Sequence, residues 1–340
     1  MKENSGIKVS VIIPTHNRPD KIADTVAALR QQTLPATDYE ILVMDDGSTP
    51  PVVLTGEIDN PRCRVVRLEG VERSAARNAG AAAAQGALLV FVDDDISVER
   101  DFLASHLQAQ IEWPEALVVG TISLTNEAMA TPFGCFRQKL EREGVPPKRG
   151  VTTLRNFCTA ANMSITRTIF QTLQGFDPML SSGEDQDFAL RYTHAGGYIT
   201  YVPEAKAVHF DSALDIKSYC QRTEWGSEKM IPFCQRHADW PDNIERARVN
   251  GAINFRQEPL AQSVRKIIKH TLTFRPVLMI LFILATLLEQ FAPNGNALDR
   301  IYRLLLGAHI ARGYQKGLQQ FGAIAPTNNK LPNPTVATDH

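Results

Sequence analysis

Residues 88–95 of this 340-residue chain have the sequence LLVFVDDD, five apolar residues followed directly by three aspartates. An apolar run of this length that starts just after a glycine, Gly86, is typical of a strand buried on both faces of a parallel sheet. The three carboxylates follow the carboxyl end of that strand, and open α/β sheets bind their ligands beyond that end. This segment therefore predicts a type of fold and the edge of the sheet where a site lies.

Strand-like and helical patterns alternate on both sides of this segment, as expected for a parallel sheet with crossover helices. They predict an α/β fold with a mostly parallel central sheet for residues 1–216. The stretch Thr131–Gly150, rich in Gly, Pro and basic residues, is expected to be a flexible loop near the site. Strands are predicted at Val9–Thr15, Ile41–Met44, Arg64–Leu68, Leu88–Val92 and Leu117–Leu124 and as a last pair at Tyr198–Val202 and Lys206–Phe210, with helices at 19–32, 74–85 and from Gly183 onward.

Composition and charge exclude several classes of function. The formal net charge of -1 argues against nucleic acid as the main partner, because a phosphate backbone selects a basic surface. The five cysteines form no C-x-x-C pair, so neither a disulfide framework nor a zinc site is expected. The N-terminal sequence MKENSGIKVS lacks the apolar core of a signal peptide, so the protein is expected to be cytoplasmic.

Residues 217–324 differ from the first part of the chain, because helical patterns and positive charge dominate there. Between Gln262 and Gln320, eight Lys or Arg stand against two acids. Val277–Leu288 is almost entirely apolar but shorter than the roughly 20 residues that cross a bilayer, so it either enters the lipid interface or packs on the protein. Leu298–Leu318 is expected to be a basic amphipathic helix suited to an anionic membrane. The region is therefore predicted to hold the protein peripherally at the inner face of the cell membrane, and residues 325–340 are predicted to be a disordered tail.

The three aspartates after the fourth strand favour a divalent cation. Adjacent carboxylates repel one another and raise their pKa values unless a positive charge compensates. Mg²⁺ or Mn²⁺ bound by Asp95, with Asp93 or Asp94, supplies that charge and would neutralise a departing nucleoside diphosphate. An acidic solvated turn is the alternative interpretation of such a triplet.

Four further groups are candidates for the same edge, each with an ordinary structural alternative. Asp45-Asp46-Gly47-Ser48 is also a common turn sequence. Arg73 and Arg77 flank the start of an alanine-rich helix, where an arginine could hold phosphate oxygens, although surface arginines are common. Asp185 at a predicted helix start is either a general base for an acceptor hydroxyl or part of a helix cap. His209, after a short strand, is a possible third ligand for Mn²⁺ or an ordinary histidine.

Several motifs in order resemble glycosyltransferase family 2, a group of inverting enzymes with the GT-A fold, which is a Rossmann-like nucleotide-diphospho-sugar transferase domain. The resemblance covers roughly residues 8–210. Each motif is weak alone, but their order is specific, and no dinucleotide fingerprint, Walker loop or G-x-S-x-G competes with it. The motifs are VSVIIPTHNR, VMDDGST, RSAARNAG, VFVDDD and NMSITRTIFQTLQGFDPMLSSGEDQDFALRYTHAGG, followed by P-x-A-x-x-x-H.

The resemblance implies a role for each matching residue. It implies a nucleotide-sugar donor and a hydroxyl acceptor on a glycan or a lipid-linked, cell-envelope intermediate. Asp185 would be the general base, and Glu184 would help to place the acceptor. The implied donor-binding residues are Pro14, Thr15, Asp46, Arg77, Asp93 and Asp94, and the implied ligands of Mn²⁺ or Mg²⁺ are Asp95, Asp93 and His209.

One departure from the family pattern bears on the product. Processive members carry Q-x-x-R-W after the catalytic core, whereas this chain has Glu224 where the arginine belongs. Transfer of one or a few sugars in polysaccharide biosynthesis is therefore expected rather than polymer extrusion. Two rival functions are a sugar-phosphate nucleotidyltransferase, which needs a Gly-rich basic loop after the first strand, and a non-catalytic membrane-associated module that binds nucleotide-sugars. The sequence leaves open the donor, the acceptor, the linkage and the oligomeric state.

Overall fold

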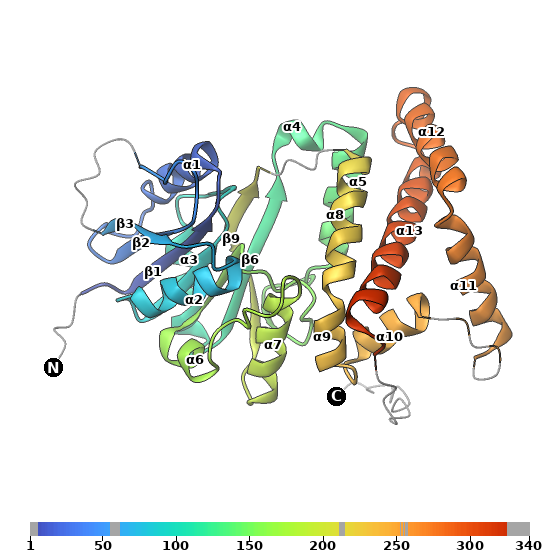
Figure 1. The fold of residues 1–340 in the computed structure, drawn as a ribbon. Coiled ribbons are helices and arrows are strands. Elements are labelled where there is room, and N and C mark those ends of the chain that lie inside the picture. The colour runs from blue at the N-terminus through green and yellow to red at the C-terminus, as the bar shows by residue number, and fades with distance from the viewer. Residues whose placement is uncertain are drawn as a thin grey trace, which may run out of the picture. The chain divides into compact units, whose positions relative to one another are not determined.

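A computed structural model describes residues 6–54, 62–210, 215–251, 253, 255 and 258–324 of the chain. It divides into two compact units, Met1–Ile216 and Lys217–His340. The ribbon in Figure 1 shows a sheet flanked by helices in the first unit and helices alone in the second. The predicted disordered tail at 325–340 lies outside the described residues.

Within the described residues, nine strands of the first unit form one sheet in the order β3-β2-β1-β4-β8-β6-β9-β5, with β7 beside β9. Strands β3, β2, β1 and β4 are mutually parallel, and β6 and β9 run in the same direction as they do. The mostly parallel sheet predicted from the sequence is therefore confirmed. The strands are β1 (Val9–Thr15), β2 (Tyr39–Asp46), β3 (Cys63–Leu68), β4 (Leu88–Val92), β5 (Ile96–Val98), β6 (Leu117–Leu124), β7 (Gly150–Thr152), β8 (Asn162–Thr166) and β9 (Ile199–His209).

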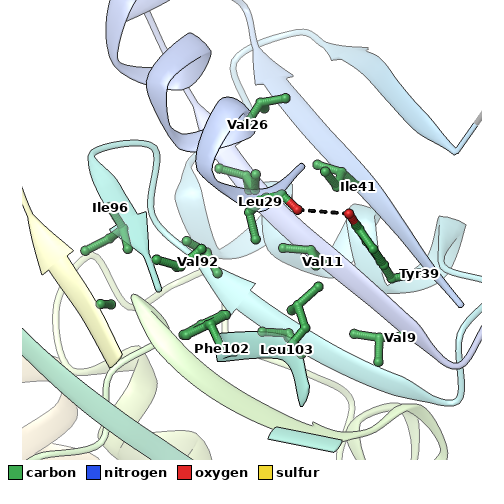
Figure 2. Close-up of a cluster of buried hydrophobic side chains, with 14 of the residues drawn as sticks. Val9, Val11, Val26, Leu29, Tyr39, Ile41, Val92, Ile96, Phe102 and Leu103 are labelled. Carbon is green, nitrogen blue, oxygen red and sulfur yellow. Dashed lines mark hydrogen bonds between the residues drawn. The ribbon is translucent and has the colours of Figure 1, made fainter. Parts of the chain in front are cut away.

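Strand β1 is buried along its whole length because helices cover both faces of the sheet. Side chains alternate between the faces of a strand, and Val9, Val11 and Ile13 accordingly belong to one core cluster while Ile12 belongs to another. The first cluster lies under α1 (Pro19–Leu29) and α3 (Phe102–Glu112). Figure 2 shows this cluster, in which the Tyr39 hydroxyl donates a hydrogen bond of 3.0 Å to the backbone oxygen of Leu29.

The opposite face of the sheet is covered by α2 (Arg73–Ala83), α6 (Arg167–Thr172) and α7 (Glu184–His194). Four aromatic rings fill the space between them. The ring centroids of Phe91 and Phe170 are 5.0 Å apart, and those of Phe176 and Phe188 are 5.5 Å apart. Because Phe188 belongs to the helix that begins with Glu184 and Asp185, this packing fixes the position of both carboxylates relative to the sheet.

Two predictions for the first unit are wrong. The stretch Thr131–Gly150 is largely a helix, α5 (Pro132–Glu143), preceded by a short helix, α4 (Asn126–Met129). The Thr131 hydroxyl caps α5 by accepting from Gly134 N over 2.9 Å, and Phe133 and Phe136 bury one face. The predicted strand pair around Pro203 is instead the single strand β9. Its register against β6 shifts after Val119 of β6, and β9 thereby continues past the proline.

The second unit contains six helices within the described residues. Helix α13 is central, because its buried side chains lie on all sides and it contacts α9, α10, α11 and α12. The prediction of a basic amphipathic surface helix at Leu298–Leu318 is therefore wrong: Lys316 and Arg312 of this helix approach Glu224 of α8, with Lys316 Nζ 2.5 Å from Glu224 Oε1. The helices are α8 (Ile216–Lys229), α9 (Ile231–Arg236), α10 (Pro241–Asn250), α11 (Leu260–Leu272), α12 (Arg275–Phe291) and α13 (Asn296–Phe321).

Helix α12 extends beyond the predicted apolar segment at both ends. One side of it, with Leu278, Leu281 and Ala285, is buried, and the helix contacts α13. The other side is exposed. Within the described residues no single helix is both long and apolar enough to cross a bilayer, whereas α11 and α12, which meet at an angle of 77°, satisfy that test of length and composition as a pair.

Helix α13 approaches α8 closely at Gly313, and this contact leads to a stability prediction. A Cβ added there would lie 2.0 Å from the backbone oxygen of Glu224, whereas at Gly307 on the same helix it would meet nothing within 4 Å. We expect Gly313→Ala to destabilise the protein by about 1–3 kcal/mol. Gly307→Ala is expected to stabilise it by up to about 1 kcal/mol, because alanine is the better helix former. Urea unfolding of both variants checks this, and equal shifts of the same sign would contradict it.

Candidate active site

The carboxyl ends of β1, β2 and β4 lie at one edge of the sheet, because these strands are parallel neighbours. The Thr15 hydroxyl donates to Asp94 Oδ2 over 2.7 Å, and the Thr25 hydroxyl donates to the Asp94 backbone oxygen over 2.8 Å. Burial raises the pKa of Asp94, although the Thr15 hydrogen bond and the charge of Arg18 oppose that rise. Asp94 thus faces inward and ties the loop after β4 to β1 and α1. The predicted approach of Thr15 to the aspartate run is confirmed at Asp94.

Asp46 and Pro14 occupy the neighbouring part of the same edge. Pro14 is buried within β1 opposite Met44. The Asp46 carboxylate accepts hydrogen bonds from the backbone N–H groups of Val71, at 2.6 Å, and Glu72, at 3.0 Å. Asp46 therefore shapes the turn that leads into α2, and its predicted contact with a nucleotide base stays a prediction.

Arg77 of α2 is the centre of the ion pairs in the first unit. Its side chain is only 1% exposed. Its Nη2 donates to Asp93 Oδ1 over 2.6 Å, and its Nη1 donates to Glu184 Oε1 over 3.2 Å. Burial favours the neutral acid at Asp93, but Arg77 and Arg73 outweigh it and hold the pKa of Asp93 below its usual value. One buried guanidinium thus joins the aspartate loop after β4 to the first turn of α7.

Asp185 stands beside this guanidinium. Gly183, whose φ is +84°, turns the chain into α7 and places Glu184 and Asp185 in its first turn. The Asp185 side chain is 17% exposed, and its Oδ1 lies 3.7 Å from Arg77 Nη1. Among the described residues this oxygen has no hydrogen-bond donor, although it is buried. Burial and the charge of Glu184 raise the pKa of Asp185 to about 7, against the opposing charges of Arg77 and Arg73.

Asp95 and His209 meet at the other end of the aspartate loop. Antiparallel pairing of β5 with β9 sets Ile96 opposite His209, and the His209 Nε2 atom lies 3.1 Å from Asp95 Oδ1. An acid and an imidazole side by side are suitable ligands for Mn²⁺ or Mg²⁺. No cluster of three His, Cys, Asp or Glu side chains with metal-binding geometry occurs in the described part of the chain. Asp93, the third predicted ligand, pairs with Arg77 instead.

Two further arginines belong to this site: Arg18, which the sequence did not single out, and Arg73, which it named beside Arg77. Arg18 Nη1 lies 3.1 Å from both Asp94 Oδ1 and Asp95 Oδ2. Arg73 Nη2 lies 2.9 Å from Glu184 Oε1, and the side chain is half-exposed. Both residues fall within segments already quoted as motifs, after the first strand and at the start of α2, so strand-end position was the signal available for them.

Residues 10–171 match the model of Glycosyl transferase family 2. The chain is 27% identical over 209 residues to the glycosyltransferase AglE of Haloferax volcanii, and the aligned region covers 59% of this chain and 66% of that protein. It is also 27% identical over 240 residues to the pre-mycofactocin glycosyltransferase of Mycobacterium tuberculosis, which covers 68% of this chain and 48% of that protein. The chain thus spans less than two thirds of the length of these curated relatives.

Solved structures show the fold independently of sequence similarity. A mannosyltransferase from Pyrobaculum calidifontis, solved in complex with GDP-Man and Mn²⁺, superposes with a TM-score of 0.54 at 18% identity and covers 91% of this chain and 88% of that one. The sheet order, the strand-end aspartates and the family match agree with one another. Residues 10–171 of this chain therefore match Glycosyl transferase family 2, a family of sugar-transferring enzymes, and the chain has the GT-A fold.

Proposed function

We propose that this protein transfers a sugar from a nucleoside-diphosphate-sugar to a hydroxyl group of a glycan or lipid-linked acceptor, with inversion at the anomeric carbon. The proposal rests on the pKa of the Asp185 carboxyl group and on the contacts of its oxygens. Its carboxylate has a pKa near neutrality and one buried oxygen to which the described residues donate no hydrogen bond. Such an oxygen is suited to accept a proton from a hydroxyl at physiological pH.

The residues around Asp185 suit a single displacement. Asp185 takes the acceptor proton as the acceptor oxygen attacks the anomeric carbon, and the nucleoside diphosphate leaves on the opposite face. A single displacement without a covalent intermediate inverts the anomeric configuration. Half-exposed Arg73 is placed to pair with diphosphate oxygens, while buried Arg77 holds Glu184 and Asp93 in position. Glu184 is 3% exposed, so its predicted part in placing the acceptor would be exerted mainly through these arginines.

Asp95 and His209 would hold a divalent cation. Mg²⁺ and Mn²⁺ sites in phosphate-handling enzymes take one or two protein ligands and fill the remaining positions with water and substrate phosphate, which fits this pair. The cation, when bound, supplies positive charge to the leaving diphosphate. Arg18, which now contacts Asp94 and Asp95, provides positive charge at the same carboxylates.

We further propose that the acceptor is presented at the inner face of the cell membrane and that the protein works there peripherally, in cell-envelope polysaccharide biosynthesis. Support comes from the exposed apolar side of α12, which carries Met279, Ile280, Ile283, Leu284 and Leu287. An apolar helix face of this kind is typical of interfacial membrane binding.

A donor screen tests the transferase proposal. Purified protein is incubated with Mn²⁺ and a panel of nucleotide-sugars, and free nucleoside diphosphate is scored with wild type and Asp185→Asn side by side. We expect metal-dependent turnover of one donor that the variant lacks. Metal-dependent donor binding by both proteins, with turnover by neither even when candidate acceptors are added, would instead support a non-catalytic binding module.

Removal of the metal leads to a second expected result. Chelation with EDTA should abolish turnover, and Mn²⁺ should restore it. Asp95→Asn and His209→Ala should each weaken Mn²⁺ binding in the presence of a nucleoside diphosphate by about tenfold or more, since each removes one of two protein ligands. Calorimetric Mn²⁺ titration provides the measurement, with Asp38→Asn, remote from the site, as control. Unchanged Mn²⁺ affinity in both site variants would remove these residues from the metal site.

The pH dependence of turnover follows from the pKa of Asp185. A base with a pKa of about 7 is protonated below that pH and inactive. At saturating donor and Mn²⁺, we expect turnover to be about thirtyfold lower at pH 5.5 than on a plateau above pH 8. Steady-state rates from pH 5.5 to 9 check this. Turnover that stays constant down to pH 5.5 would exclude Asp185 with this pKa as the base.

A further inference from the structure

A basic cavity of about 280 Å³ lies between α10 and α11 in the second unit. Its lining includes four cations, Arg248, Arg265, Lys266 and Lys269, and one acid, Glu245. Arg248 Nη2 pairs with Glu245 Oε2 over 2.5 Å, and Lys266, which is 3% exposed, pairs with Glu258. These ion pairs do not include the other two cations of the cavity, Arg265 and Lys269.

Neither Lys269 nor Arg265 forms an ion pair with a described carboxylate, although Arg265 lies near enough to Glu245 to contribute to the lowered pKa of that acid. The Lys269 ammonium donates to the neutral Asn250 side-chain oxygen over 2.5 Å. Burial lowers the pKa of Lys269, as expected for an ammonium group without a counter-charge. Four cations against the two acids Glu245 and Glu258 leave the cavity with an excess of positive charge. Such a cavity is complementary to an anion that offers several oxygens, and phosphate is the commonest biological group of that kind.

The cavity adjoins an exposed apolar surface. On α11, Val264 and Ile268 flank Arg265 and Lys269 in sequence, and both apolar side chains are exposed. On α12 the exposed side runs from Met279 to Phe291 at helical spacing. Phe274, which is 63% exposed, lies at the bend between the two helices. The exposed apolar side chains of α11 and α12 are Leu260, Val264, Ile267, Ile268, Met279, Ile280, Ile283, Leu284, Leu287 and Phe291.

A phosphate site beside a long apolar surface matches one class of ligand. A membrane lipid carries a phosphate group at the boundary between water and hydrocarbon, and cationic side chains near that boundary strengthen binding. We infer that the α10–α11 cavity binds the phosphate group of a membrane lipid whose apolar chain lies along the exposed sides of α11 and α12. The inference rests on the proposed membrane position and specifies the lipid contact.

Vesicle flotation of the full chain tests this inference. Vesicles of phosphatidylcholine alone are compared with vesicles that also contain phosphatidic acid, without donor or metal. The double variant Arg265→Gln/Lys269→Gln removes two cations from the cavity, and Arg300→Gln/Arg303→Gln removes two from exposed positions on α13. We expect the cavity variant to bind phosphatidic acid vesicles about tenfold or more weakly than wild type, and the α13 variant to lose clearly less. Equal losses in the two variants would overturn the phosphate site.

A second variant tests the apolar surface. Ile283→Gln/Leu287→Gln should weaken binding to both kinds of vesicle, since it shortens the apolar face. Unchanged vesicle binding of this variant would overturn the lipid contact. The lipid contact would also be overturned if the wild-type protein were a dimer and these substitutions dissociated it, because a second copy of the chain would then cover these helices. Calorimetry with inorganic phosphate distinguishes a lipid phosphate group from a free phosphate ion. If wild type bound inorganic phosphate but not vesicles, and the cavity variant lost phosphate binding, the site would be assigned to a free anion. Asp185→Asn should bind vesicles like wild type, so the vesicle test can be interpreted even if the proposed sugar transfer proves wrong.

Discussion

Asp185→Asn should lower the turnover number by about 10²- to 10⁴-fold, the range that general-base catalysis contributes. The substitution keeps the shape of the side chain and removes only the ability to take the acceptor proton. Donor binding should change little, because the acceptor hydroxyl and not the donor meets this group. Steady-state kinetics and donor calorimetry on the same preparation measure both quantities.

The stability of this variant separates lost chemistry from lost folding. In the folded protein the pKa of Asp185 is about 7, above the usual 3.8, so ionisation is less favourable folded than unfolded. The carboxylate therefore costs stability increasingly as pH rises from about 4 to about 7. Asparagine never ionises, so the variant should melt at or above the wild-type temperature at pH 8. A lower melting temperature together with lost turnover would point to misfolding instead.

A neighbouring acid provides the matched control. Asp187 lies on the same helix, is fully buried and pairs with Arg191 over 2.8 Å. Asp187→Asn should lower the melting temperature because the contact of this buried carboxylate with the Arg191 guanidinium is weakened, while the turnover number stays within a few-fold of wild type. If Asp185→Asn kept more than about a tenth of wild-type turnover, another group would have to serve as the base.

Arg77→Met should lower the free energy of unfolding by about 3–5 kcal/mol, because it removes the counter-charge that the buried carboxylate of Glu184 shares with the partly exposed carboxylate of Asp93. Arg73→Met is the matched control. Its guanidinium also pairs with Glu184, but the side chain is half-exposed, so we expect a loss below about 1 kcal/mol. Urea unfolding measures both variants.

The conservative substitution sharpens this prediction. In Arg77→Lys a single ammonium replaces a planar group whose two terminal nitrogens contact Asp93 and Glu184 separately. We expect most of the stability loss to persist, since one point charge cannot span both acids. Equal stability of Arg77→Met and wild type would show that the acids are protonated or solvated in the folded protein.

Sequence patterns predicted the sheet and its functional edge because strand periodicity and strand-end residues are local signals. The run at 88–95 is the clearest case, since a buried apolar strand and three acids meet there without interruption. Asp95 and His209 also lie together as their strand-end positions suggest. Their roles in metal and donor binding stay predictions.

The remaining features depend on contacts that no local pattern encodes. Thr131–Gly150 has a loop-like composition, yet burial of Phe133 and Phe136 stabilises a helix there. Arg303, Arg312 and Lys316 suggested a membrane-facing α13, but Gly313 and the buried Glu224 bring α8 against this helix. Arg77 pairs with both Asp93 and Glu184, and Glu184 is 107 positions from Arg77 in the sequence. Sequence spacing cannot reveal such a contact.

The pairing of β5 with β9 makes the site dependent on a late part of the chain. Asp95 and His209 are 114 residues apart, and Asp185 also follows the family-matched segment, which ends at 171. During synthesis the strand ends of β1, β2 and β4 leave the ribosome well before Asp185 and His209 do. A shortened chain that ends near 171 would therefore keep these strand ends while lacking both Asp185 and His209. If the proposed metal site is correct, Mn²⁺ affinity would report how far assembly of the sheet has progressed.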